Sequence, residues 1–173
     1  MAVGYVRAMN VVARPNWFQR GFQRFASLRP VAWGFRHTAH HLDKLTVKWW
    51  GGRTLSGMLA GIPNILLTTT GAKSGEARTV PLVGLHVDGT VAIVGTRFGA
   101  EQHPGWYHNL VHDPRAVVEV HGERSEVVAR AVPDGPEYDR IMAVADTVYV
   151  GYAKYRRRIH GRRIPIFVLE SRG

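Results

Sequence analysis

LLTTTGAKSGEARTVPL, residues 66–82, shows the clearest structural pattern in the chain. β-Branched and apolar residues at 65–70 and at 79–87 predict the two strands of a β-hairpin. In the turn between them, Gly71 and Gly75 tolerate positive φ angles, which let successive backbone N–H groups face one concavity. Lys73 and Arg78 flank this concavity. The pattern therefore predicts either an anion-binding hairpin tip or a solvated tip that is basic by chance.

The composition is that of one soluble globular domain with an appended segment: 173 residues, 45% hydrophobic and 21% charged. The absence of cysteine excludes a disulfide framework, thiolate metal ligands and a cysteine nucleophile, and it fits a reducing cytoplasm. The sequence shows no signal peptide and no run of about 18 apolar residues. We therefore expect a cytoplasmic protein.

Positive charge and aromatic side chains gather in the N-terminal third. The net charge is +10, and residues 1–53 hold nine Lys or Arg against one Asp, together with nine aromatic residues. Phe18, Phe22 and Phe25 are spaced as on one face of a helix. We predict a basic, aromatic helical segment over 1–53 and the main domain over 54–173.

Three interpretations fit such a segment. Its aromatic face can pack on the domain core, or it can attach the protein peripherally to the anionic inner face of the cell membrane. These two interpretations stay open. Binding to nucleic acid is not expected, because no recognised motif accompanies the charge.

After residue 63 the sequence changes to short β-rich runs separated by turns. Asp88-Gly89 is a two-residue turn signal, and Pro104 suits the first turn of a helix. Several antiparallel strands without a strand–helix–strand rhythm indicate a small barrel in an α+β protein. Beyond the first hairpin we expect strands at 90–95, 116–121, 124–132 and 164–170, and helices at 105–111 and 136–148.

Two groups of histidines invite a metal-site interpretation, which the spacing does not support. Asn109 stands where an H-E-x-x-H motif needs its glutamate, so no metal is expected. A hydrolytic triad is equally unsupported, since the sequence has no G-x-S-x-G elbow. The histidines concerned are His37, His40, His41, His103, His108 and His112.

Tyr149, Tyr152 and Tyr155 fall at positions i, i+3 and i+6, on one side of a helical turn. Their hydroxyl groups can line an apolar pocket and donate a proton or a hydrogen bond. Alternatively, the three tyrosines only cap the barrel by packing on it. Both interpretations stay open.

Three motifs in order resemble the deazaflavin-dependent nitroreductase family, over roughly residues 51–170. L-T-T-T-G-x-K-S-G-x-x-R-x-x-P-L begins at Leu67, and H-P-x-W-Y-x-N-L begins at His103. Y-x-x-Y-x-x-Y begins at Tyr149 and is followed by I-P-I-x-V-L-E from Ile164. The resemblance implies an antiparallel split β-barrel of the FMN-binding type with flanking helices, to which the basic aromatic pattern at 1–53 adds an expected N-terminal helical extension. It also implies an oxidoreductase that binds reduced coenzyme F420 and passes a hydride to a second substrate.

The resemblance also implies site residues. Lys73 and Arg78 would hold the anionic phosphate and polyglutamate tail, and Thr96 and Tyr152 would be catalytic. The implied cofactor-binding residues are Thr70, Lys73, Ser74, Arg78, Pro81, Thr96, Arg97, Gly99, Trp106 and Asn109. The implied substrate-binding residues are Val83, Tyr149, Tyr152 and Tyr155.

This chain departs from the family pattern at two positions. Val83 and Phe98 stand where some relatives carry Tyr and Gly, so we expect a more apolar pocket for a lipophilic acceptor such as a quinone, a nitroaromatic compound or a similar molecule. Two alternatives stay open: a split-barrel enzyme that uses FMN, and a non-catalytic protein that binds F420 or lipid. The oligomeric state, with a homodimer among the options, is also open.

Overall fold

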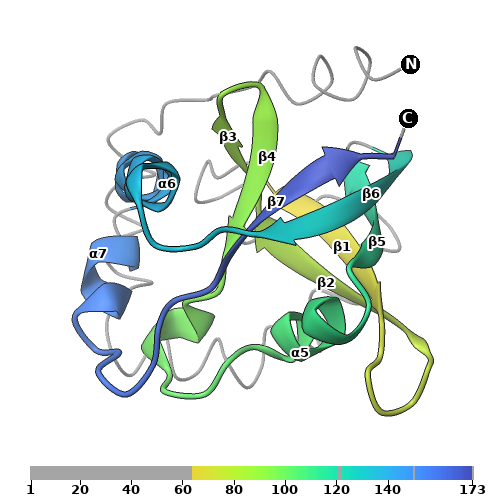
Figure 1. Cartoon of the computed structure of the whole chain (residues 1–173), viewed down its shortest axis with the longest axis horizontal. Coiled ribbons are helices and arrows are strands. Elements are labelled where there is room, and N and C mark those ends of the chain that lie inside the picture. The colour runs from red at the N-terminus through yellow and green to blue at the C-terminus, as the bar shows by residue number, and fades with distance from the viewer. Residues whose placement is uncertain (1–63, 121, 150, 173) are drawn as a thin grey trace.

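The computed structural model describes residues 64–120, 122–149 and 151–172, which form an antiparallel sheet with helices on its surface (Figure 1). The helices predicted within 1–53 lie outside the described residues. The strands are β1 (Asn64–Thr70), β2 (Ala77–Val83), β3 (Leu85–Val87), β4 (Thr90–Val94), β5 (Arg115–Val120), β6 (Glu123–Ala131) and β7 (Ile166–Ser171). The helices are η1 (Arg97–Gly99), α5 (Gly105–His112), α6 (Pro136–Val148) and α7 (Gly151–Arg156).

The seven strands follow the order β2-β1-β5-β6-β7-β4-β3, and each neighbouring pair is antiparallel. β2 and β3 are consecutive in the chain although they lie at opposite ends of this order. The sheet therefore curls until its two ends meet at Gly84. A Cβ atom at Gly84 would lie 2.7 Å from Cγ2 of Ile65, so this crossing needs a residue without a side chain.

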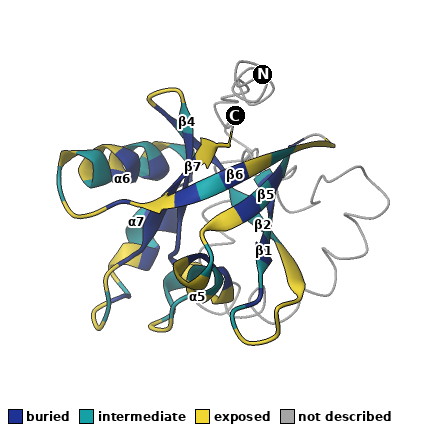
Figure 2. Ribbon diagram, turned by 45° about the vertical axis from the view of Figure 1, so that its right-hand side comes forward, coloured by how far each residue is buried: buried dark blue, intermediate teal, exposed yellow. Residues whose placement is uncertain are grey.

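β4 and β7 are buried on both faces, because one face lines the barrel and the other lies under helices (Figure 2). Their alternate residues belong to two separate clusters of buried side chains. The barrel core includes Ile65, Leu67, Val91, Ile93, Trp106, Leu110, Val118, Val127, Phe167 and Leu169. The helix-covered core includes Leu85, Ala92, Val94, Ile141, Met142, Tyr149, Tyr152, Tyr155, Ile166 and Val168.

The predicted α+β antiparallel barrel is confirmed, and most predicted elements lie within two residues of the observed ones. The strand predicted over 79–87 is the exception. The chain pairs with β1 as far as Val83 and then with β4 from Leu85, so one apolar run forms two strands. The change occurs at Gly84, where the chain passes from one end of the sheet to the other.

Several loops and short helices gather at one end of the barrel (Figure 1). The β1–β2 turn, α5 and η1 lie in the lower part of the view, and α7 lies at its lower left. The β3–β4 turn and the adjoining ends of β5 and β6 lie at the opposite end (Figure 1). The first group carries nearly all the side chains that the sequence motifs single out.

Candidate functional site

The β1–β2 turn is a tight loop that presents two cations to solvent. The N–H of Gly71 donates to the carbonyl of Glu76 and the N–H of Gly75 to that of Gly71, both at 2.8 Å. Gly75 has a φ of 69°, which a residue with a side chain adopts only under strain. Lys73, Ser74 and Arg78 are exposed, and Arg78 forms a 2.6 Å ion pair with Glu76. This pair is solvated and open to competition from another anion.

Asn109 on α5 binds this turn from behind. Its Nδ2 donates to Oγ1 of Thr69 at 2.9 Å, and its Oδ1 accepts the N–H of Ala72 at 3.0 Å. Thr69 is almost completely buried, and Asn109 is half-buried. Both ends of one amide thus fix α5 to the hairpin, so Asn109 contributes to the shape of the anion-facing turn.

The loop after β4 has an unusual backbone. Arg97, Phe98 and Gly99 have φ angles of 46°, 57° and 81°, and Thr96 before them is right-handed. A right-handed residue followed by a left-handed one turns successive N–H groups toward the same side, a geometry suited to partial negative charge. Left-handed geometry costs a residue with a side chain about 1–2 kcal/mol, and such strain is found mostly at functional sites.

Side chains of this loop contact His103, just before α5, and helix α7. Nη1 of Arg97 donates to the carbonyl of His103 at 3.2 Å. Phe98 is 44% exposed, and its ring meets that of Tyr155 edge-on with a centroid distance of 6.0 Å. A Cβ atom at Gly99 would lie 3.0 Å from Cδ of Arg158, so the loop approaches α7 closely. Thr96 is 5% exposed, so its side chain is covered.

The segment after α7 holds this loop in place, which the sequence motifs did not indicate. The guanidinium of Arg162 donates to the carbonyls of Gly95, Thr96 and Ala100 at 2.9–3.2 Å. The carboxylate of Glu101 accepts the N–H groups of His160 and Gly161 at 2.9 and 3.0 Å. The basic run at 156–163 is the signal in the sequence, but nothing in its order singles out Arg162.

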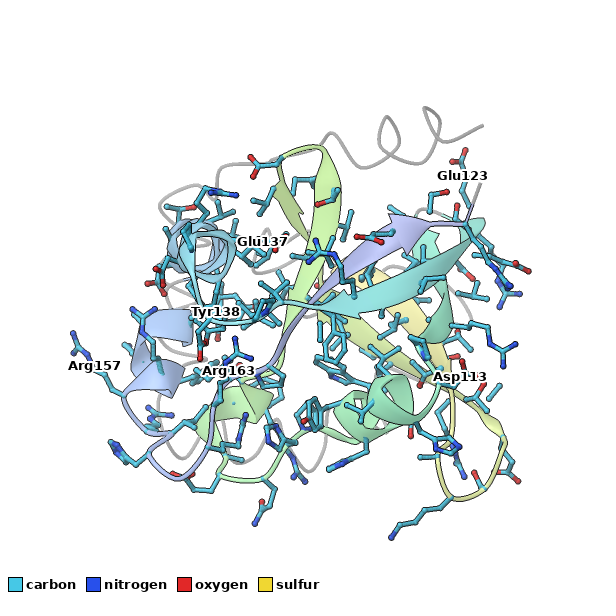
Figure 3. The ribbon with its side chains drawn as sticks, viewed as in Figure 1. Asp113, Glu123, Glu137, Tyr138, Arg157 and Arg163 are labelled. Carbon is cyan, nitrogen blue, oxygen red and sulfur yellow. The ribbon has the colours of Figure 1, made fainter. Side chains whose placement is uncertain are left out.

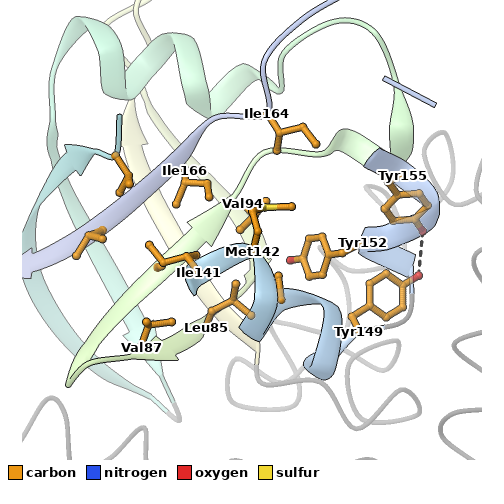
Figure 4. Close-up of a cluster of buried hydrophobic side chains, with 14 of the residues drawn as sticks. Leu85, Val87, Val94, Ile141, Met142, Tyr149, Tyr152, Tyr155, Ile164 and Ile166 are labelled. Atoms are coloured by element: carbon orange, nitrogen blue, oxygen red, sulfur yellow. Dashed lines mark hydrogen bonds between the residues drawn. The ribbon is translucent and has the colours of Figure 1, made fainter. Parts of the chain in front are cut away.

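The three predicted tyrosines belong to the helix-covered core (Figure 4). The hydroxyls of Tyr149 and Tyr155 are hydrogen-bonded at 2.9 Å. Tyr152 packs edge-on against Tyr149, and its hydroxyl points away from this pair toward Met142 and Val94. The tyrosines therefore lie close together, but their hydroxyl groups do not all face one side.

Burial keeps these phenols neutral. Removal from water raises the pKa of Tyr152 well above its usual range, and the charge of Tyr149 would raise it further. Burial also raises the pKa of Tyr149 and of Tyr155. A neutral phenol can donate a hydrogen bond at any physiological pH, but it is a weaker acid than a phenol in water.

The remaining predicted residues lie around these elements. The Trp106 ring is buried in the barrel core, 6.0 Å from that of Phe167, whereas its neighbour Tyr107 stacks on His103 with 4.1 Å between centroids. Val83 is half-buried and packs against the helix-covered core, which also contains the three tyrosines. Thr70 and Pro81 are half-buried on the hairpin strands.

An open groove of about 340 Å³ adjoins the hairpin on the outer face of β1, β5 and β6. Its charged lining consists of Asp113, Arg115, Glu126 and Arg172. Asp113 and Arg115 form an ion pair at 2.9 Å, and Asp113 lies close to the hairpin in Figure 3. The formal charges in the groove balance, so its lining alone does not favour an anion.

Within residues 64–120, 122–149 and 151–172, no group of three or more His, Asp or Glu side chains is placed to hold a metal ion. None of the helices in that part of the chain is long and apolar enough to cross a membrane.

Comparison with known proteins gives consistent matches. The model of the F420H(2)-dependent quinone reductase family matches residues 41–171. The F420H(2)-dependent quinone reductase Rv1261c of Mycobacterium tuberculosis is 36% identical over 112 residues, which are 64% of this chain and 74% of that protein.

Two solved structures are also similar. An F420-H2 dependent reductase, FDR-A, has a TM-score of 0.57 at 36% identity, covering 62% of this chain and 94% of its own. A structure described as a domain-swapped dimer has a TM-score of 0.59 at 31% identity, covering 82% of this chain and 99% of its own.

Proposed function

This chain belongs to the F420H(2)-dependent quinone reductase family, and from that premise we propose that it is an oxidoreductase that uses reduced coenzyme F420 to reduce a lipophilic acceptor of the quinone type. The observation that carries the proposal is the group of anion-suited elements at one end of the barrel: the β1–β2 turn, which Asn109 of α5 binds, and the strained loop at 96–99, which Arg97 connects to His103 just before α5. An extended molecule with an anionic tail needs such a series of sites.

The donor set fits the chemistry of the coenzyme. Lys73 and Arg78 are exposed on the β1–β2 turn, and guanidinium and ammonium groups are the usual partners of phosphate and carboxylate. Ser74 adds a hydroxyl to this turn. We infer that these three side chains hold the phosphate and the polyglutamate tail, with Thr70 and Pro81 shaping the strand beneath.

The loop at 96–99 suits the ring end of the coenzyme. When bound, the reduced deazaflavin supplies the hydride, and the protein supplies binding, orientation and electrostatics. We infer that the backbone of Thr96 and Gly99 approaches the ring and that Arg97 adds positive charge there. Trp106 and Asn109 support this arrangement, Trp106 from the barrel core and Asn109 through its contacts with the hairpin.

The acceptor side is apolar. Val83 packs against the buried cluster that contains Tyr149 and Tyr155. We infer that these carbon-rich side chains with their phenol hydroxyls form one wall of the acceptor site, which suits a planar lipophilic molecule better than a charged one. We assign Tyr152 the role of hydrogen-bond donor toward the acceptor, because its phenol stays protonated. In the described structure its hydroxyl faces Met142 and Val94, so this role requires the side chain to turn toward the acceptor when the acceptor binds. Nitroaromatic compounds share the planar, electron-poor character of quinones and are the second acceptor class to assay.

Parallel titrations of the protein with F420 and with FMN test the assignment. F420 should bind more tightly, and its affinity should fall as salt rises, because screening weakens contacts between exposed charges. Lys73→Ala should weaken F420 binding by about ten- to a hundredfold, since a charged hydrogen bond contributes about 1.5–3 kcal/mol. Arg124→Ala is the matched control, because it removes an exposed cation paired with Glu119 at the β5–β6 end. Equal affinity for F420 and FMN contradicts the assignment, and turnover of a quinone with reduced F420 separates an enzyme from a binding protein.

We further propose that residues 1–53 form a segment distinct from the domain at 54–173 and attach it to an anionic membrane surface on the cytoplasmic side. Nine cations and nine aromatic side chains support this, since a basic residue near anionic lipid contributes about 1 kcal/mol. The full chain should co-sediment with anionic liposomes, less so as salt rises, and not with neutral ones. Sedimentation that does not depend on lipid charge rejects the proposal.

A similar structure is described as a domain-swapped dimer. The mass of this protein in solution should therefore be measured to determine whether it forms a homodimer.

A further inference from the structure

Arg162 makes an unusual set of contacts for a cation. Its Nε and Nη2 both donate to the carbonyl of Ala100, at 3.2 and 2.9 Å, and Nη2 also donates to that of Thr96 at 3.2 Å. Its Nη1 donates to the carbonyls of Gly95 and Arg163 at 3.1 and 3.2 Å, and lies 3.4 Å from Nδ1 of His103. Among the described residues, its hydrogen-bond partners are carbonyl oxygens and this imidazole nitrogen rather than carboxylates.

These carbonyls stand on both sides of the left-handed turn. Gly95 and Thr96 precede it, and Ala100 follows it. The bonds of the turn itself run from the N–H of Gly99 to the carbonyl of Thr96, at 2.9 Å, and from the N–H of Ala100 to the carbonyl of Arg97, at 3.1 Å. One rigid, planar group thus ties the two ends of the turn together, which three rotating donors on a lysine cannot reproduce.

We propose that Arg162 is a positioning residue that holds residues 97–99 in their left-handed conformation, so that the loop is already shaped for the coenzyme before it binds. The proposal rests on the proposed function, because the loop is where we place the ring of F420. Left-handed geometry is unfavourable for Arg97 and Phe98, so the free loop relaxes unless its surroundings hold it.

A second side chain, Glu101, also connects the loop to the segment that contains Arg162. The carboxylate of Glu101 binds the backbone of His160 and Gly161, just before Arg162 in the chain. The loop and residues 159–163 are therefore cross-linked by one arginine from one side and one glutamate from the other. A loop fixed in this way binds a ligand without the cost of ordering itself.

Arg163 provides a matched control. It is also an arginine, and it is bound to the carboxylate of Asp134 at 2.7 Å and to the carbonyl of Val132 at 2.9 Å. Its guanidinium lies over the ring of Tyr138, 4.8 Å from the ring centroid, and Figure 3 shows these two side chains together. Arg163→Ala therefore removes an equally well-bound cation from the same segment without removing a bond to the loop.

The first measurement is amide hydrogen exchange on the full chain without coenzyme. Arg162→Ala should speed exchange at Gly99 and Ala100 about tenfold or more, because their hydrogen bonds belong to the turn, while exchange at Gly75 in the hairpin stays unchanged. Arg163→Ala should leave the loop amides as they are. Unchanged loop exchange in a folded Arg162→Ala protein overturns the proposal whatever the function is. If Arg162→Ala does not fold, Arg162→Lys carries the same test, with a smaller increase expected.

The second measurement is F420 affinity and turnover. Arg162→Ala should raise the Kd of F420 about tenfold, and low concentrations of free guanidinium ion should recover part of this loss. The same ion should not improve Lys73→Ala, whose missing group is an exposed ammonium. Faster loop exchange together with an unchanged Kd and turnover number would show that Arg162 holds the loop but would reject its role in coenzyme binding. Failure of the unsubstituted protein to bind F420 rejects the proposed function and leaves the exchange result standing.

Discussion

Replacement of Asn109 by alanine should destabilise the protein by about 2–3 kcal/mol. The half-buried amide makes two hydrogen bonds, to Oγ1 of Thr69 at 2.9 Å and from the N–H of Ala72 at 3.0 Å. Each contributes about 1 kcal/mol net, and an N–H left without a partner in a half-buried position adds to the cost. The loss should appear as a fall of about 1–2 M in the urea midpoint, for a denaturant slope of about 1–3 kcal/mol per molar.

A double-mutant cycle separates the hydrogen bond from general damage to the helix. Thr69→Val removes the hydroxyl at nearly constant volume, so Asn109→Ala should cost about 1 kcal/mol less in that background. His112→Ala, an exposed change in the last turn of α5, should shift the stability by less than about 0.5 kcal/mol. If Asn109→Ala is no more harmful than His112→Ala, or if the cycle shows no coupling, the amide does not fix the hairpin to α5.

Three further outcomes are expected. Tyr152→Phe should lower the turnover number and leave the Kd of F420 within about twofold, as measured by steady-state kinetics and titration; a lost affinity with normal turnover contradicts the role of its hydroxyl. Gly84→Ala should destabilise the fold by about 1–3 kcal/mol in urea unfolding, because the new Cβ would overlap Ile65. Gly75→Ala, whose Cβ would meet no atom within 4 Å, should cost only the strain of its positive φ, about 1 kcal/mol. Burial lowers the pKa of His103, as do Arg162 and His108, and burial also lowers that of His86. The stability that these neutral imidazoles contribute should be fully present above the ordinary imidazole pKa of about 6.5 and should be lost as pH falls through the lowered folded-state pKa values. His103→Gln should make the free energy of unfolding depend less steeply on pH between about 7.5 and 5.5, and an unchanged slope contradicts the assignment.

The sequence determined a large part of this architecture. Buried apolar residues alternate with more exposed residues in β5 and β6, because a strand that is buried on one face places its buried side chains at every second position. β4 and β7 contain continuous apolar runs, because they are buried on both faces. Glycine and proline mark turns for local steric reasons, which act on each residue alone. The same local logic predicted a basic turn containing Lys73 and Gly75, and that turn is present.

Contacts between distant residues were decided by the tertiary structure. The run at 79–87 reads as one strand, and only closure of the barrel divides it at Gly84. The tyrosine spacing predicted a shared helical face, but packing against α6 and β4 sets the direction of the Tyr152 hydroxyl. Arg162 lies 62 residues from Ala100 in sequence and is one cation in a run of several. No local pattern could show that its guanidinium would meet the carbonyls of that loop, because the meeting depends on how β4 and β7 pair.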